Sequence, residues 1–308
     1  MKLLKLIKVD NWFSRSINLE RDKSSIDAVN AYVPTSTAIK TLRLILKTFN
    51  NSKTSRSWSL IGPYGSGKSS FGIFLNAILQ PSSSDQFKLA IKKIAEIDDD
   101  LSKAYVSKLK NSDGCLNILL TGSYESLTKK LFNSLALEIE NSLLEKRLKN
   151  KLLKFHKDEL DLTSSDDLIE FLKLLQASII QSKKDIKGIS ITIDELGKHV
   201  EYAGSNQKDG DIYVLQKIAE HCVSESDAPI FFNVMLHQGI EFYAKELDKE
   251  TKAEWRKIQG RFEEISFIEG PEQSMRVIAK ALKQDLKANQ LARIKKRFKS
   301  SSPGVVKS

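Results

Sequence analysis

The sequence has few cysteines, few histidines and no long apolar run. Two cysteines, Cys115 and Cys222, are too few for a disulfide framework, so a reducing, cytoplasmic compartment is expected. Cys222 with His199, His221 and His237 matches no closed zinc-site spacing. No apolar stretch reaches the length of a signal-peptide core or a membrane span, so no membrane association is expected.

Positive charge is concentrated near the end of the chain. The net charge is +10, and the segment from Lys283 onward holds eight Lys or Arg against one Asp. The residues before it are therefore close to neutral. This basic tail has two interpretations, a solvated helix end or an arm that contacts DNA or RNA phosphates.

Apolar segments alternate between strand-like and helix-like patterns along the 308 residues, which indicates an α/β fold with a parallel sheet covered by helices. About five strands are expected, at 58–61, 116–121, 189–193, 229–236 and 264–268. Helices are expected at 34–50, 69–79, 212–222 and 271–282. Further helical insertions are expected at about 80–114 and 124–184, with DLTSSDD at 161–167 as a helix-capping signal.

A glycine-rich stretch follows the first of these strands. It matches the pattern G-x-x-x-x-G-K-[ST], known as Walker A, with Gly62, Pro63, Tyr64, Gly65, Ser66, Gly67, Lys68 and Ser69. Glycines let backbone N–H groups converge on phosphates, and the following helix adds the positive end of its dipole. The sequence therefore predicts nucleotide binding by residues 62–70, including Ser70, with Lys68 at the β- and γ-phosphates and Ser69 on Mg²⁺.

A β-branched strand ending in two acids, Asp194 and Glu195, has the form called Walker B. We expect Asp194 to be a magnesium ligand and Glu195 to be the general base that activates water. Taken alone, such an ending is also common at the surface of ordinary strands. Its position after a glycine-rich loop and an intervening strand favours the catalytic interpretation.

These motifs, in this order, resemble those of AAA+ ATPases. The resemblance implies a P-loop NTPase fold, a polar sensor at the end of the fourth strand, where His237 and Gln238 lie, and an arginine finger at Arg261 in the Gly-Arg-Phe-Glu segment 260–263. A surface arginine is the alternative for Arg261. His237 and Gln238 depart from the usual sensor residues, and which of the two serves is open. The stretch 194–202 also resembles ATPases encoded in bacterial antiviral-defence or DNA-associated gene clusters.

The resemblance implies three segments: an N-terminal segment at 1–33, an ATPase core at 34–270, and a partial lid helix with a basic tail at 271–308. Mg²⁺-dependent ATP hydrolysis is expected to drive a remodelling step on a DNA or protein partner, in a homo-oligomer or with partner ATPase subunits. The alternative is a nucleotide-operated switch or scaffold with little turnover. Because only one lid helix follows the last strand, we expect weak hydrolysis and a chain that is part of a longer ATPase or a truncated product.

Overall fold

The computed structural model describes residues 7–9, 15–49, 54–158, 160–206, 212–243 and 249–284. The chain divides into two compact units. The larger unit comprises residues 17–269, and the smaller one combines residues 1–16 with residues 270–308. Within the described residues, no helix combines the length and apolar character needed to cross a membrane.

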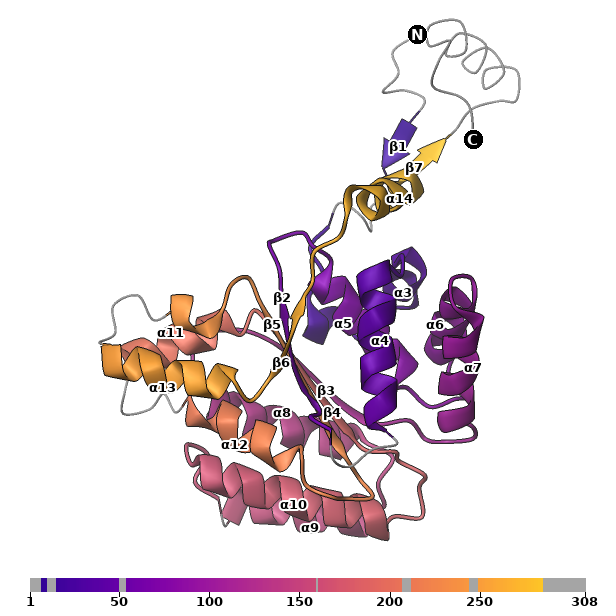
Figure 1. Ribbon diagram of the computed structural model, residues 1–308. Coiled ribbons are helices and arrows are strands. Elements are labelled where there is room, and N and C mark those ends of the chain that lie inside the picture. Colours follow the sequence, from indigo (N-terminus) through magenta and orange to yellow (C-terminus); the bar gives the residue numbers. More distant parts are fainter. Residues whose placement is uncertain are drawn as a thin grey trace, which may run out of the picture. The chain divides into compact units, whose positions relative to one another are not determined.

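A five-stranded, all-parallel sheet forms the centre of the larger unit (Figure 1). Its spatial order is β3-β4-β5-β2-β6. The strands are β2 (Ser57–Ile61), β3 (Leu116–Thr121), β4 (Ile189–Asp194), β5 (Ile230–Leu236) and β6 (Glu263–Ser266). Because β5 lies between β2 and β4, the ends of these three strands meet at the middle of the carboxyl edge of the sheet. The first four strands are rich in buried apolar residues, as expected for a parallel sheet covered on both faces.

Helices cover both faces of the sheet (Figure 1). Those that share the main apolar core with alternate residues of β3, β4 and β5 are α8 (Leu127–Asn141), α9 (Lys146–Asp158), α10 (Ser165–Gln181), α11 (Gly197–Ser205), α12 (Tyr213–His221) and α13 (Lys249–Gln259). The opposite face is covered by α4 (Ser36–Thr48), α5 (Lys68–Ile78), α6 (Asp85–Ala95) and α7 (Asp99–Lys108).

Several helices begin at side-chain caps, one of them in the DLTSSDD segment that the sequence indicates. Thr35 accepts a hydrogen bond from the N–H of Ala38 at the start of α4. Ser164, within the DLTSSDD segment, accepts one from the N–H of Asp167 at the start of α10. Each cap satisfies one of the backbone donors that have no partner in the first turn of a helix.

The larger unit begins at residue 17, earlier than the boundary at 34 that the sequence suggested. Two short helices, α2 (Leu19–Asp22) and α3 (Ile26–Ala31), pack against α5. Leu19 and Val29 are fully buried, so residues 17–33 contribute to the core. This segment was too short and too polar to show a helical period in the sequence.

The smaller unit contains α14 (Pro271–Ala281) and a two-stranded antiparallel ladder of β1 (Ile7–Val9) and β7 (Leu282–Gln284). The helix ends one residue earlier than expected, because Leu282 begins β7. Met275 and Ile278 of α14 are exposed. The apolar positions of the expected lid helix therefore have little covering surface within the described residues.

Candidate functional site

The glycine-rich loop connects the carboxyl end of β2 to the start of α5. Gly65 has φ 77° and Gly67 has φ 89°, a left-handed conformation that favours glycine at both positions. Gly67 is also the residue before α5, and no side chain caps this helix. The N–H groups of its first turn are therefore available to an anion, and the helix dipole favours negative charge there.

The side chain of Lys68 lies inside this loop. Its ammonium group donates to the carbonyl oxygens of Gly62 at 2.6 Å and Pro63 at 3.0 Å, and to Ser66 Oγ at 3.3 Å. Burial lowers the pKa of Lys68, and the nearby carboxylate of Asp194 partly opposes that shift. The buried ammonium group of Lys68 thus lies inside the loop that the sequence motif assigns to phosphate binding.

Asp194, at the end of β4, is buried and contacts the loop. Its carboxylate accepts a hydrogen bond from the N–H of Glu195 at 2.8 Å, and the side chain of Ser69 lies close enough to lower the pKa of Asp194. Burial raises the pKa of Asp194, and the Ser69 side chain and the Glu195 N–H partly offset the rise. One carboxylate and one hydroxyl fit Mg²⁺, which takes few protein ligands and completes its octahedron with waters and substrate phosphates.

Glu195 has the unusual backbone angle φ 50°. For a residue with a Cβ, this conformation costs about 1 kcal/mol or more and marks a position held by its surroundings. A Cβ on Gly122, after β3, would collide with the carbonyl of Glu195, so the two turns are in close contact. The Glu195 carboxylate forms an ion pair with Lys198, at 2.5 Å between Oε2 and Nζ.

The end of β5 brings His237 beside the loop. The His237 ring stacks on Tyr64, with 3.4 Å between ring centroids. Both ring nitrogens are buried, and neither has a hydrogen-bond partner among the described residues. Burial and the neighbouring Lys68 ammonium lower the pKa of His237, whereas Asp194 and Glu195 oppose the shift. His237 therefore faces the same charged groups as the loop, with unused hydrogen-bonding capacity.

Tyr243 supports the turn that follows β5, and sequence patterns gave no signal for it. The N–H of His237 donates to Tyr243 Oη at 3.1 Å, and the N–H of Gln238 also interacts with this hydroxyl. The Tyr243 ring lies so close to Gly197, at the start of α11, that a Cβ there would collide with it. Tyr243 thus links the end of β5 to the turn that carries Glu195.

Arg261 lies away from these groups. Arg261 precedes β6. Phe267 follows β6 and donates its N–H to the carbonyl of Ile61, at the end of β2 beside the loop, at 2.7 Å. Because β2 and β6 are parallel, Arg261 is at the opposite edge of the sheet, about 17 Å of strand rise away. Its guanidinium pairs with Glu220, at 3.1 Å between Nε and Oε1, and half of its side chain is exposed.

Two other histidines form hydrogen bonds with residues outside the loop. His199 Nδ1 bonds to the carbonyl of Glu125, and His221 Nε2 bonds to Gln176 Oε1, each at 2.8 Å. Cys115 and Cys222 are buried free thiols. Over the described ranges, no three His, Cys, Asp or Glu side chains are close enough together to bind a metal ion.

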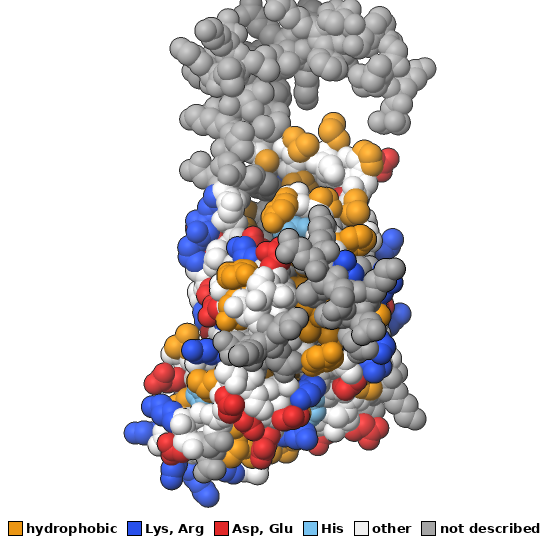
Figure 2. Space-filling view, turned by 90° about the vertical axis from the view of Figure 1, so that its left-hand side faces the viewer, with side chains coloured by type: hydrophobic (Ala, Val, Ile, Leu, Met, Phe, Trp, Pro, Cys, Tyr) orange, Lys and Arg blue, Asp and Glu red, His pale blue; other side chains and the backbone are white. Residues whose placement is uncertain are grey.

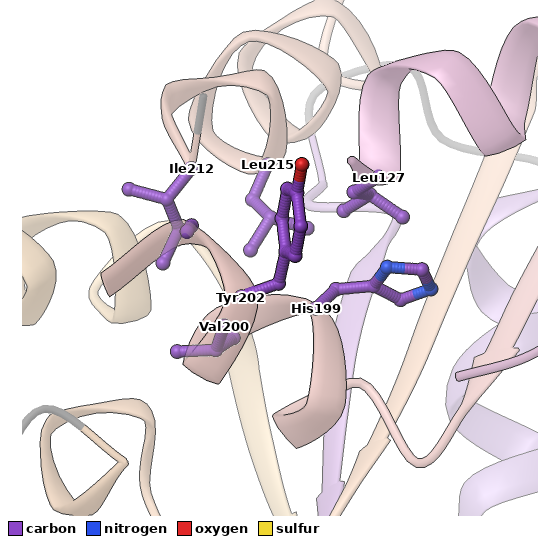
Figure 3. A pocket seen from close by; sticks show the side chains of 7 residues that line it. Leu127, His199, Val200, Tyr202, Ile212 and Leu215 are labelled. Carbon is purple, nitrogen blue, oxygen red and sulfur yellow. The ribbon is translucent and has the colours of Figure 1, made fainter. Parts of the chain in front are cut away.

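A separate small cavity lies between α8, α11 and α12 (Figure 3). It is lined by Leu127, His199, Val200, Tyr202, Ala203, Ile212 and Leu215. Figure 3 shows Tyr202 between Leu215 and Leu127, with the His199 ring directed away from Ile212. Its volume of about 10 Å³ is enough for about one water molecule, so it is not a nucleotide pocket.

No protein-family model matches this chain, and no curated protein matches its sequence. Any functional conclusion therefore depends on the loop, the strand ends and their contacts.

Proposed function

We propose that this chain binds ATP with Mg²⁺ and hydrolyses it, as a P-loop NTPase of AAA+-like organisation. The observation that carries the proposal is the closeness of the Ser69 side chain to the Asp194 carboxylate, whose pKa it lowers. These are the two residues that the sequence motifs assign to magnesium, and they come from separate motifs on strands that are not neighbours. Chance motif matches would have no reason to meet in this way.

The residues at the carboxyl edge have complementary roles in this proposal. Lys68 and the N–H groups at the start of α5 bind the phosphates. The Lys68 ammonium would then contact phosphate oxygens in place of the loop carbonyls. Ser69 and Asp194 hold Mg²⁺, which neutralises charge on the phosphate oxygens. Glu195 accepts a proton from the attacking water. His237 donates a hydrogen bond toward the γ-phosphate, and it is favoured over Gln238 because its ring nitrogens lie buried among the same charges.

The position of Arg261 favours an oligomer. At the edge of the sheet opposite the loop, this residue cannot reach the nucleotide bound by its own chain. If it acts on a phosphate, that phosphate belongs to a neighbouring subunit. The proposed assembly is therefore a homo-oligomer, or a complex with partner ATPase subunits, with a DNA or protein partner as the object of remodelling.

Binding and turnover are tested separately. We expect the purified chain to bind ATP in an equilibrium titration and to release phosphate only with Mg²⁺. Glu195→Gln should retain ATP affinity and reduce turnover by about 10²- to 10⁴-fold, since an amide cannot accept the proton. Glu201→Gln, on the exposed side of α11, is the matched control. Parent-level hydrolysis by Glu195→Gln would remove the general-base assignment, and absence of ATP binding by the parent chain would remove the proposal.

The ion pair between Glu195 and Lys198 favours a second possibility, a nucleotide-operated switch. A base held by a neighbouring ammonium is less available to water, so nucleotide could be retained with little turnover. Slow hydrolysis with tight retention of ATP, measured in a single-turnover experiment, would support the switch. Rapid multiple turnover stimulated by a partner would support the remodelling ATPase.

A further inference from the structure

Helix α9 carries positive charge that its surroundings do not balance. Its 13 residues include six Lys or Arg and a single acid, Asp158. Helix α9 is therefore net +5, whereas residues 1–282 as a whole, which include it, are only +3. The remainder of that span is net negative, so charge is segregated onto this helix. It is a different segment from the basic C-terminal tail.

The cations of α9 lie on one face. At about 100° per residue, five exposed side chains fall within an arc of about 140°. They are Lys146, Arg147, Lys151, Lys154 and Lys157. None of the five forms an ion pair within the part of the chain that the structure describes. Elsewhere, exposed lysines such as Lys88 and Lys103 do pair, with Asp85 and Asp99.

The basic face continues beyond the helix. Glu145, just before α9, accepts hydrogen bonds from Ser182 Oγ at 2.8 Å and from the N–H of Lys183 at 2.7 Å. This contact turns the acid that precedes α9 toward the end of α10. It also places the exposed Lys183 and Lys184 beside the start of α9. Figure 2 is turned about the vertical axis of Figure 1, and its lower end, the level at which α9 and α10 lie in Figure 1, shows Lys and Arg side chains mixed with Asp and Glu.

The opposite side of α9 is already occupied. Leu152 is buried in the main core, and Leu148, Leu153 and Phe155 pack against that core. Helix α9 therefore has no free apolar face to insert into a membrane. Nor does any exposed aromatic side chain, among the described residues, lie on α9 or α10 to stack an unpaired base.

We propose that the basic face of α9, extended by Lys183 and Lys184, binds the phosphate backbone of double-stranded nucleic acid without reading its sequence. A helix of 13 residues is about 20 Å long, enough to follow several successive phosphates. Binding of this kind depends on counterion release and so weakens steeply with salt. The interface is independent of the nucleotide loop, so its failure would leave the proposed ATPase activity untouched.

The test uses a fluorescent 25-base-pair duplex of arbitrary sequence and the intact chain. A variant with Lys146, Arg147, Lys151, Lys154 and Lys157 all changed to Gln should bind at least about tenfold more weakly in an anisotropy titration. The slope of log affinity against log salt should fall by up to about 4. The five side chains are exposed, and glutamine is a good helix former, so the fold should be retained. Circular dichroism and basal ATP hydrolysis verify this.

Three controls decide the assignment. The matched control changes Lys40, Lys88, Lys92, Lys103 and Lys110 to Gln, which removes the same charge from another exposed surface. It should retain duplex binding. Changing the four lysines of the α9 face to Arg should also retain it. The proposal would be overturned if the α9 variant and the matched control lost duplex binding equally. It would also be overturned if neutralising the tail from Lys283 abolished duplex binding while neutralising α9 did not. Equal affinity of the parent chain for the duplex and for phosphatidylserine vesicles or polyaspartate would overturn it as well.

Discussion

The side chain of Ser69 lies beside the carboxylate of Asp194 and lowers its pKa. One residue lies in the first turn of α5 and the other at the end of β4, and β5 separates β4 from the strand that leads into α5. The contact therefore spans the middle of the carboxyl edge of the sheet. Crevices at this edge are where open parallel sheets bind their ligands.

Removal of the Asp194 charge should stabilise the protein while abolishing Mg²⁺-dependent ATP binding. Burial raises the folded-state pKa of Asp194 above its unfolded value. The folded chain then binds the proton more tightly, so stability falls as pH rises through the window between the two pKa values. Asp194→Asn cannot ionise, so its Tm should exceed that of the parent at pH 7.

That difference should shrink as pH falls through this window and level off below the unfolded-state pKa of about 4, where the parent carboxyl becomes protonated in both states. Thermal melts from pH 3 to pH 8 measure it, with the exposed Asp99→Asn as the control. A lower Tm for Asp194→Asn throughout this range would show that its hydrogen bonds outweigh the cost of burying its charge.

Lys68→Ala should weaken ATP binding by at least about 100-fold, because it removes the charge complementary to the phosphates. It also leaves the buried carbonyl of Gly62 without its lysine donor, so some loss of stability is expected. Isothermal titration with ATP measures the affinity. Lys88→Ala, an exposed lysine on α6, should bind like the parent. Parent-like affinity in Lys68→Ala would rule out phosphate binding by this loop.

Lys198→Met should raise kcat by up to about fivefold and leave the affinity for ATP unchanged. Lys198 holds the Glu195 carboxylate, but half of its side chain is exposed, so the pair is worth at most about 1 kcal/mol. Steady-state kinetics of the parent and the variant give kcat and KM. A fall in kcat would mean that Lys198 assists catalysis, and would remove the reason for treating the pair as a restraint.

Four strands of the sheet, β2 to β5, were predictable because they are short apolar runs that end in recognisable turns. Asp194 and Lys68 were predictable for a different reason, since each occupies a fixed place in a local motif. Contacts between distant segments left no such signal. Tyr243 follows β5 by several residues and acts through its hydroxyl and ring, while the pairing of β1 with β7 joins opposite ends of the chain.

Tyr243→Phe should lower kcat by about tenfold with little change in ATP affinity. The change removes the hydroxyl that accepts hydrogen bonds from the end of β5 and should cost about 1 kcal/mol of stability. Gly197→Ala should have the same kinetic effect, because its methyl group would displace the Tyr243 ring from the other side. The exposed Tyr124→Phe is the control. Equal losses in kcat and affinity would indicate general disruption of the site.

Arg261 should act on nucleotide bound by a neighbouring subunit. Its place before β6, at the edge opposite the glycine-rich loop, prevents it from serving its own chain. The exposed pair with Glu220 is weak enough to be exchanged for a phosphate. Arg261→Ala should therefore lower hydrolysis without weakening ATP binding, while Glu220→Gln should leave hydrolysis intact or raise it.

Mixing the inactive variants Arg261→Ala and Lys68→Ala tests the shared site. In a mixed oligomer, some interfaces combine an intact loop from one subunit with an intact Arg261 from the other. Activity should therefore recover in part, and the recovery should depend on the mixing ratio. Light scattering or native mass measurement establishes that the variants co-assemble. If they co-assemble and no ratio restores hydrolysis, Arg261 is an ordinary surface residue paired with Glu220.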